Sequence, residues 1–254
     1  MASAAVNPPP SAGPGTGSPA PADFHEPHPR PTVLSDFILG SQDGIVNVLG
    51  IILGLAAAAQ SVHVILIATL AAMGAESIAM GAVAYTSTLS RRRLYLSEVV
   101  REKLEMETVP EVERSEVREI LAGWGYQGSE LEDLLDRLCR NPRAMLEFML
   151  AFELKLSPVE PTAPRISAGI VGSATVLGHA IPLVPFFFIG TDILFGGVLA
   201  VAFSAVALFT IGWYEARITD GSWWRNGPQM VVIGLAGGFA GYLIGHLVGA
   251  TPGL

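Results

Sequence analysis

Five stretches of the chain contain no acidic or basic side chains and are dominated by apolar residues. They run over residues 44–75, 77–90, 166–191, 193–214 and 226–254. A helix needs about 20 apolar residues to cross the hydrocarbon core of a bilayer, and the second stretch reaches this length when Glu76 lies inside the span. The pattern therefore predicts five transmembrane helices, over residues 36–59, 62–90, 166–188, 193–214 and 228–249.

The composition agrees with a multi-pass membrane protein of the all-α class. Of the 254 residues, 50% are hydrophobic and 15% are charged, whereas a soluble domain carries about 25% charged residues. The net charge of −8 gives no basic face for a nucleic acid, and the single cysteine, Cys139, excludes an intramolecular disulfide. Glycines recur in the spans and let helices approach closely in lipid, so we expect a compact bundle.

All 15 lysine and arginine residues lie on one side of the predicted topology. They fall within residues 1–34, 91–165 and 215–227, which five spans place on the same side of the membrane. Because positively charged loops stay in the cytoplasm, we expect a cytoplasmic N-terminus and a C-terminus outside the cytoplasm. The chain divides into a tail (1–34), two spans (35–90), a polar segment (91–165) and three spans (166–254).

The tail holds nine of the 18 prolines, and this composition predicts disorder. It lacks the apolar centre and cleavage site of a secretory signal. The missing targeting segment and the short soluble parts favour a bacterial plasma (inner) membrane, with a vacuolar membrane as the eukaryotic alternative.

The polar segment is expected to form a helical cytoplasmic domain. Residues 91–107 continue the second span as a helix, Thr108-Val109-Pro110-Glu111 resembles a capping box that begins another helix, and residues 129–140 and 144–156 predict two more. Between Glu98 and Glu160 there are 15 acidic and eight basic residues. A solvated helical surface with ion pairs is one interpretation of this excess.

The spacing of some of these residues favours a second interpretation, a metal site. Residues three or four positions apart share one face of a helix. Three such pairs occur in the segment: Glu102 with Glu105, Glu113 with Glu116, and Met149 with Glu153. Carboxylates bind divalent cations and a thioether adds preference for transition metals, so these residues predict a metal-binding site if the helices converge.

Polar residues inside the spans are candidates for an ion path. Asp43 begins the first span with Asn47 one turn later, and Glu76 lies inside the second span, on one face with Met73 and Met80. An intramembrane acid is costly and therefore suggests a function. Core or lipid packing of the methionines, and a structural hydrogen bond for Glu76, stay open as alternatives. His179 and His246 are interpreted as interface polar groups.

Several short motifs, taken in order, resemble the vacuolar iron transporter family. They are SDFILGSQDG at residues 35–44, SIAMG at 77–81, the glutamate-spaced segment 102–116, FMLAFEL at 148–154 and IPLVPF at 181–186. Together the similarity covers residues 35–250. Members of this family are divalent-metal/proton antiporters with five spans and a cytoplasmic helical metal-binding domain between the second and third.

The resemblance implies a homodimer that exports Fe²⁺ from the cytoplasm in exchange for protons, with Mn²⁺ or another divalent transition metal as an alternative cargo. It makes Asp43 a translocation carboxylate and places Glu76 and Met80 along a path lined by the first two spans. It implies that the cytoplasmic domain holds metal through a set of six residues, namely Glu102, Glu105, Glu113, Glu116, Met149 and Glu153.

Two departures from the family pattern bear on these roles. Leu150 stands where relatives often carry a further acidic ligand, which leaves the number of bound ions open. Residues 81–85 are GAVAY where many members carry Gly-Glu-Tyr, which leaves open whether Glu76 replaces the missing acid.

Two other classes of function are weighed against a transporter, and one of them stays open. One is a membrane-tethered iron sensor or storage module, in which the spans serve only as an anchor. An iron-oxidising enzyme is not expected, because ferritin-like sites use Glu-x-x-His pairs and residues 91–165 contain none.

Overall fold

The computed structural model describes residues 31–58, 60–188, 190–219 and 221–249, and all its regular elements in these ranges are helical. Within these ranges, five helices are long and apolar enough to cross a membrane, which agrees with the number of predicted spans. They are α1 (Pro31–Ala57), α2 (Val62–Thr108), α6 (Ala163–Leu183), α7 (Ile193–Ile218) and α8 (Trp223–Gly249). Four short elements lie between α2 and α6: α3 (Pro110–Gly123), α4 (Gly128–Cys139), α5 (Pro142–Phe148) and the π-helix η1 (Met149–Glu153).

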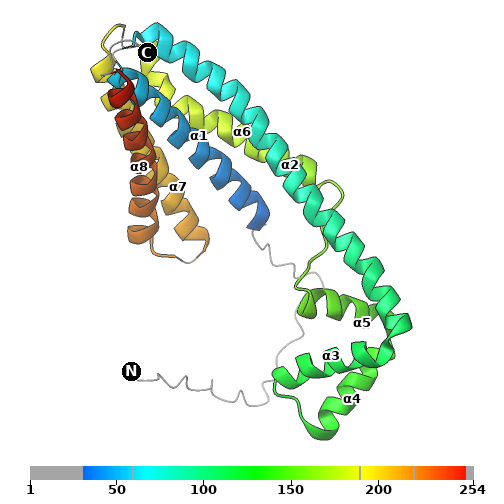
Figure 1. Cartoon of the computed structure of the whole chain (residues 1–254). Helices are drawn as coiled ribbons and strands as arrows, with labels where there is room; N and C mark the ends of the chain where they lie inside the picture. The colour runs from blue at the N-terminus through cyan, green and yellow to red at the C-terminus, as the bar shows by residue number, and fades with distance from the viewer. Residues whose placement is uncertain (1–30, 59, 189, 220, 250–254) are drawn as a thin grey trace, which may run out of the picture.

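The apolar helices form a bundle with α1 at its centre. α1 packs between α6 and α8, α2 covers α6, and α7 lies against α8 (Figure 1). The buried core contains Val48, Leu49 and Ile52 of α1 together with Ile65 of α2 and Ala200 of α7. Because α1 supplies most of these core residues, its polar side chains are held close to those of its neighbours.

Helix α2 connects the bundle to the polar segment. Its 47 residues extend over about 70 Å at a rise of about 1.5 Å per residue, more than twice the hydrocarbon thickness of a bilayer. The apolar part ends at Ser90, before Arg91, Arg92 and Arg93. Beyond them α2 continues to α3, α4 and α5, which lie at its far end (Figure 1). This continuation of the second span to residue 107 is confirmed.

Several predicted boundaries need correction. Residues 31–34 belong to α1 rather than to the tail; a proline is tolerated in a first helical turn because its missing N–H has no partner there. The rest of the tail, residues 1–30, lies outside the described residues. In the third span, the α-helix ends at Leu183, one residue after Pro182, and a 3₁₀-helix, η2 (Val184–Phe187), follows.

The predicted capping box does not form. Thr108 is the last residue of α2, and its hydroxyl donates to the carbonyl of Leu104 at 2.7 Å. Helix α3 instead begins with Val109 as its N-cap, without a side-chain cap, and Pro110 in the first turn. An N-cap residue needs a non-helical backbone, and Thr108 is still within α2, so the cap position falls on Val109, which has no side-chain oxygen to accept a hydrogen bond.

The polar segment has its own small core. Val117 and Leu121 of α3, Leu135 of α4, and Met145 and Met149 are all buried in one cluster. The helix predicted over residues 144–156 begins at Pro142 and changes at Met149 into the π-helix η1, in which the Leu154 N–H donates to the Met149 carbonyl at 3.1 Å. Lys155, at a φ of 54°, ends this run in the left-handed region.

Glycines let α1 and α8 touch along their backbones. A Cβ added at Gly241 would overlap the carbonyl oxygen of Gly50. We expect Gly241→Ala to separate the two helices and to lower the unfolding free energy by about 1–3 kcal/mol, the usual cost of overpacking. Thermal unfolding in detergent measures this effect. The control is Gly169→Ala, since nothing lies within 4 Å of a Cβ there; equal midpoints for both variants would contradict the close contact.

Candidate metal and ion-path sites

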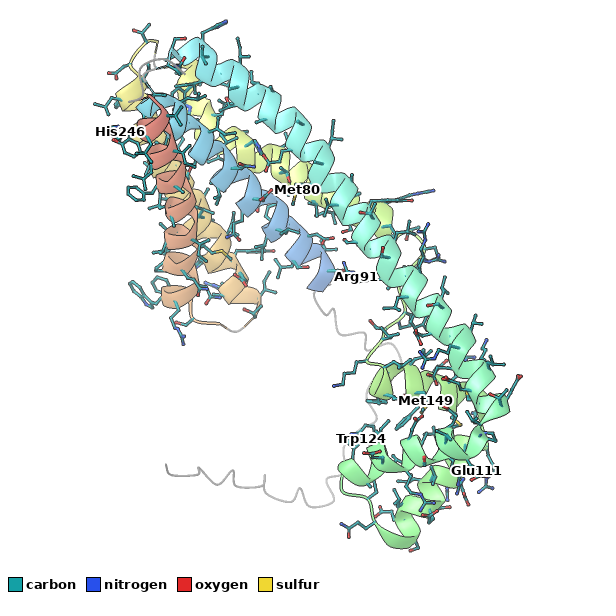
Figure 2. All side chains as sticks on the ribbon, viewed as in Figure 1. Met80, Arg91, Glu111, Trp124, Met149 and His246 are labelled. Atoms are coloured by element: carbon teal, nitrogen blue, oxygen red, sulfur yellow. The ribbon has the colours of Figure 1, made fainter. Side chains whose placement is uncertain are left out.

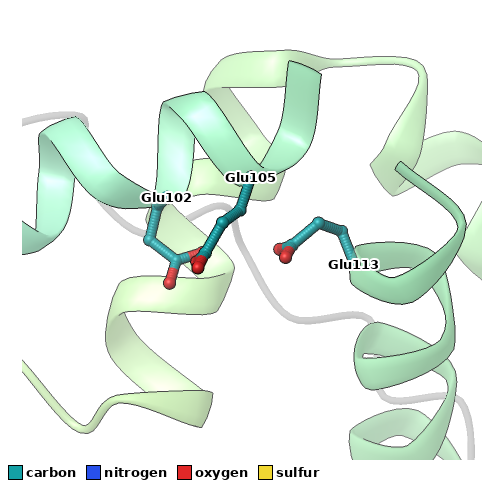
Figure 3. Close-up of side chains that lie close together, drawn as sticks. All are labelled: Glu102, Glu105 and Glu113. Carbon is teal, nitrogen blue, oxygen red and sulfur yellow. The ribbon is translucent and has the colours of Figure 1, made fainter. Parts of the chain in front are cut away.

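Three glutamates converge where α2 ends and α3 begins. Glu102 and Glu105 lie in the last two turns of α2, and Glu113 lies in the first turn of α3. One carboxylate oxygen of each lies within 4.8 Å of the others (Figure 3). The break at Val109 and Pro110 turns the chain so that these helix ends face each other. The spacing of the glutamates in the sequence does not predict this turn.

Two of the three carboxylates of this acidic cluster (Glu102, Glu105 and Glu113) are unusually buried for acids. The third, Glu105, is 34% exposed and accepts a hydrogen bond from Arg101 Nε at 3.2 Å. Glu102 is 2% exposed and Glu113 is 3% exposed, and each has a buried Oε2 without a hydrogen-bond partner. The Oε2 of Glu153 is also buried and has no hydrogen-bond partner. Buried charged oxygens are costly unless they are paired or bind a metal. A set of hard oxygen ligands turned toward one small space has the chemistry that a divalent cation requires.

The other predicted acids belong to the same electrostatic group. Burial, and then the charges of Glu102, Glu116 and Glu153, raise the pKa of Glu113 to about 7. Burial, and then the charges of Glu116 and Glu102, raise the pKa of Glu153 to about 7. The fold therefore brings the three predicted pairs into one region, although Met149 itself is fully buried within the apolar core of the segment.

These pKa values predict a pH dependence. Unfolded glutamate titrates near pH 4.3, so between about pH 4.3 and 7 the folded, metal-free chain binds more protons than the unfolded chain. Its unfolding free energy therefore falls as pH rises through this window. Metal binding needs the deprotonated carboxylates, so we expect stabilisation by Mn²⁺ to be larger at pH 8 than at pH 6. Thermal unfolding at both pH values measures it, and equal metal-induced shifts would contradict the expectation.

The solvated-surface interpretation applies to several other charged residues of the segment. Arg114 pairs with Asp136, Arg118 hydrogen-bonds Glu132 at 2.9 Å, and Arg143 pairs with Glu147 at 3.0 Å. These partners are partly or largely exposed, and pairs of this kind add little stability. Each sequence interpretation therefore has residues that fit it, and Glu105, which pairs with Arg101 at 3.2 Å, belongs to both groups.

A polar cluster lies inside the bundle, where α1, α2 and α6 meet. Asn47 Nδ2 of α1 donates to Glu76 Oε1 of α2, and His179 Nε2 of α6 lies 2.9 Å from Glu76 Oε2. Asp43, one turn before Asn47, is close enough to Glu76 and His179 for direct electrostatic interaction. Three of the five predicted path residues thus meet. Met73 and Met80 are both partly buried and lie on the α2 face that carries Glu76; Met80 is labelled in Figure 2.

Sequence analysis did not assign His179 to this cluster. It is completely buried, and its Nε2 lies within hydrogen-bond distance of Glu76 Oε2. Gly44 makes room for it, since a Cβ there would lie 2.8 Å from His179 Nδ1 and 2.5 Å from the Thr175 carbonyl oxygen. The sequence held one sign of a functional role for His179: it is an ionisable residue within a span that has no Asp, Glu, Lys or Arg.

Comparison with known proteins agrees with the resemblance carried by the motifs. The family model described as "VIT family" matches residues 34–246. Vacuolar iron transporter 1 of Arabidopsis thaliana is 32% identical over 216 residues, covering 85% of this chain and 86% of its own. Vacuolar iron transporter 2 of Oryza sativa subsp. japonica is 34% identical over 203 residues, covering 80% and 82%. Protein CCC1 of Saccharomyces cerevisiae is 26% identical over 223 residues, covering 84% and 69%.

The family match spans the five long helices and the polar segment between the second and third of them. It includes both the acidic cluster and the intramembrane polar cluster. The chain is therefore a membrane protein that belongs to the VIT family.

Proposed function

We propose that this chain is a secondary transporter that moves Fe²⁺ out of the cytoplasm in exchange for protons, with Mn²⁺ as an alternative cargo. The observation that carries the proposal is that one continuous helix, α2, bears two sites. Glu102 and Glu105 lie at its polar end, and Glu76 lies within its apolar part. Relatives named as vacuolar iron transporters support iron as the cargo.

In this proposal the polar segment captures the metal. The acidic cluster, joined by Glu116, Met149 and Glu153, binds divalent cations and raises their concentration beside the bundle. Buried oxygens without donors support this role. The carboxylates also suit Mn²⁺, whereas a thioether ligand favours softer metals, so the cargo preference depends on whether Met149 takes part.

The ion path is proposed to run past Asp43, Asn47, Met73, Glu76 and Met80. Proton antiport rests on the family resemblance and on the two carboxylates, Asp43 and Glu76. We further propose a homodimer whose paths are lined by the first two spans of each protomer. The distribution of lysine and arginine supports a cytoplasmic location for the polar segment and the N-terminus.

The rival function is a tethered iron sensor or storage module. A full-length variant with Glu102→Gln, Glu105→Gln and Glu113→Gln, called the cluster variant below, separates the two functions. We expect it to retain slow Fe²⁺ flux in proteoliposomes, because the residues inside the bundle are intact. If the wild-type chain binds Fe²⁺ without flux, the sensor becomes the better account.

A further inference from the structure

His179 forms the inner end of the intramembrane polar cluster. Its side chain is 0% exposed, whereas 17% of the Glu76 side chain is exposed, and Asn47 is exposed. The neighbouring spans add no further metal-binding acid or base here. Residues 193–214 of α7 contain no Asp, Glu, His, Lys or Arg, and the one such residue of 226–249, His246, lies near the end of α8. The cluster is therefore open on the side of α1 and α2 and closed by the imidazole of α6.

The hydrogen bonds of His179 determine which ring nitrogen faces the cluster. Nδ1 lies 2.8 Å from the carbonyl oxygen of Thr175. A carbonyl oxygen can only accept, so Nδ1 carries a hydrogen and donates it. Nε2 is then the nitrogen turned toward Glu76. Metal-binding histidines are typically held in this way, with one nitrogen donating to a carbonyl and the other directed at the ion.

The positions of Glu76 and His179 also suit one shared ion. Nε2 and Oε2 are 2.9 Å apart. Two adjacent ligands of an octahedral divalent ion, each about 2.1 Å from the metal, lie about 3.0 Å apart. Asn47 holds the other oxygen of the carboxylate from α1, so the orientation of Glu76 is set by two helices before any ion arrives. A preset pair of this kind binds a metal with little rearrangement.

We propose that Glu76 and His179 form a transition-metal site inside the membrane, with His179 Nε2 as a nitrogen ligand supplied by α6. This inference rests on the proposed function and extends it, because the path is then lined by three spans rather than two. Imidazole suits iron, nickel, copper and zinc, whereas oxygen-only sites suit manganese and magnesium. His179 therefore makes the intramembrane site selective for Fe²⁺ over Mn²⁺.

X-ray absorption of Fe²⁺ bound to the cluster variant tests this site directly, because bound imidazole gives characteristic outer-shell scattering. We expect imidazole scattering in the cluster variant, its loss when His179→Gln is added, and its retention when His246→Gln is added as the matched control. Fe²⁺ affinity should fall at least about tenfold with His179→Gln, since loss of even an outer-shell partner costs that much. The affinity for Mn²⁺ should change less.

The outcomes separate this inference from the proposed function. Absence of imidazole scattering in the cluster variant overturns the site, and this measurement does not depend on whether His179→Gln folds. Scattering that persists in His179→Gln overturns it as well. Iron flux without imidazole ligation would support the proposed transport function and contradict the His179 site. Imidazole ligation without flux in the wild-type chain would support the His179 site and contradict the proposed transport function.

Discussion

Glu113→Gln is expected to weaken Fe²⁺ binding by the polar segment at least about tenfold. The side chain is 3% exposed and supplies one of three carboxylates whose oxygens lie within 4.8 Å of each other. Glutamine keeps the size of the side chain but removes the negative charge, and losing a ligand costs at least as much as losing an outer-shell partner. Isothermal titration of the purified full-length chain under anaerobic conditions measures the change.

A neighbouring acid provides the control for this prediction. Glu111 lies in the same first turn of α3 but is exposed and outside the acidic cluster. Glu111→Gln should leave Fe²⁺ affinity within about twofold of the wild type, as expected for an exposed charge screened by solvent. Equal losses in the two variants would mean that the segment attracts metal through its overall charge, without a defined site.

Asp43→Asn and Glu76→Gln are each expected to abolish proton movement coupled to metal transport. Both amides preserve side-chain size, and glutamine retains an oxygen that can accept a hydrogen bond from Asn47. Neither can bind and release a proton near neutral pH, so coupled exchange should fall to background. A pH dye inside proteoliposomes reports the effect.

The matched control for these amides is Asp36→Asn. Asp36 lies about two turns before Asp43 in α1 and is not among the residues that contact Glu76. Proton coupling should survive this change. If coupling is unchanged in both Asp43→Asn and Glu76→Gln, the proposed roles of the two carboxylates are refuted.

The five spans could be predicted because their signal is local. An uncharged apolar stretch of sufficient length is read from neighbouring residues, without knowledge of what it packs against. The glutamate pairs were found for the same reason, since residues three positions apart share a helix face wherever the helix lies. The contact between Glu102 and Glu113 depends on the turn at Val109 and Pro110. The sequence predicted a capping box at this turn, and the box does not form.

The features that were missed depend on tertiary contacts. His179 is 103 residues from its partner Glu76, so their contact has no local signature. The π-helix at Met149–Glu153 ends a run of apparently regular helical sequence. η1 packs against α2 and α3. Short π-helical segments of this kind are frequent at functional sites.

Ferrous-ion flux into proteoliposomes that contain a pH dye tests the central claim most directly. Under an imposed proton gradient, the wild-type chain should carry Fe²⁺ with matching proton movement, and Asp43→Ala should lose both. Such a result establishes antiport and places Asp43 on the path. Metal binding by the wild-type chain without any flux would contradict the account, and would make capture by the acidic cluster the whole function.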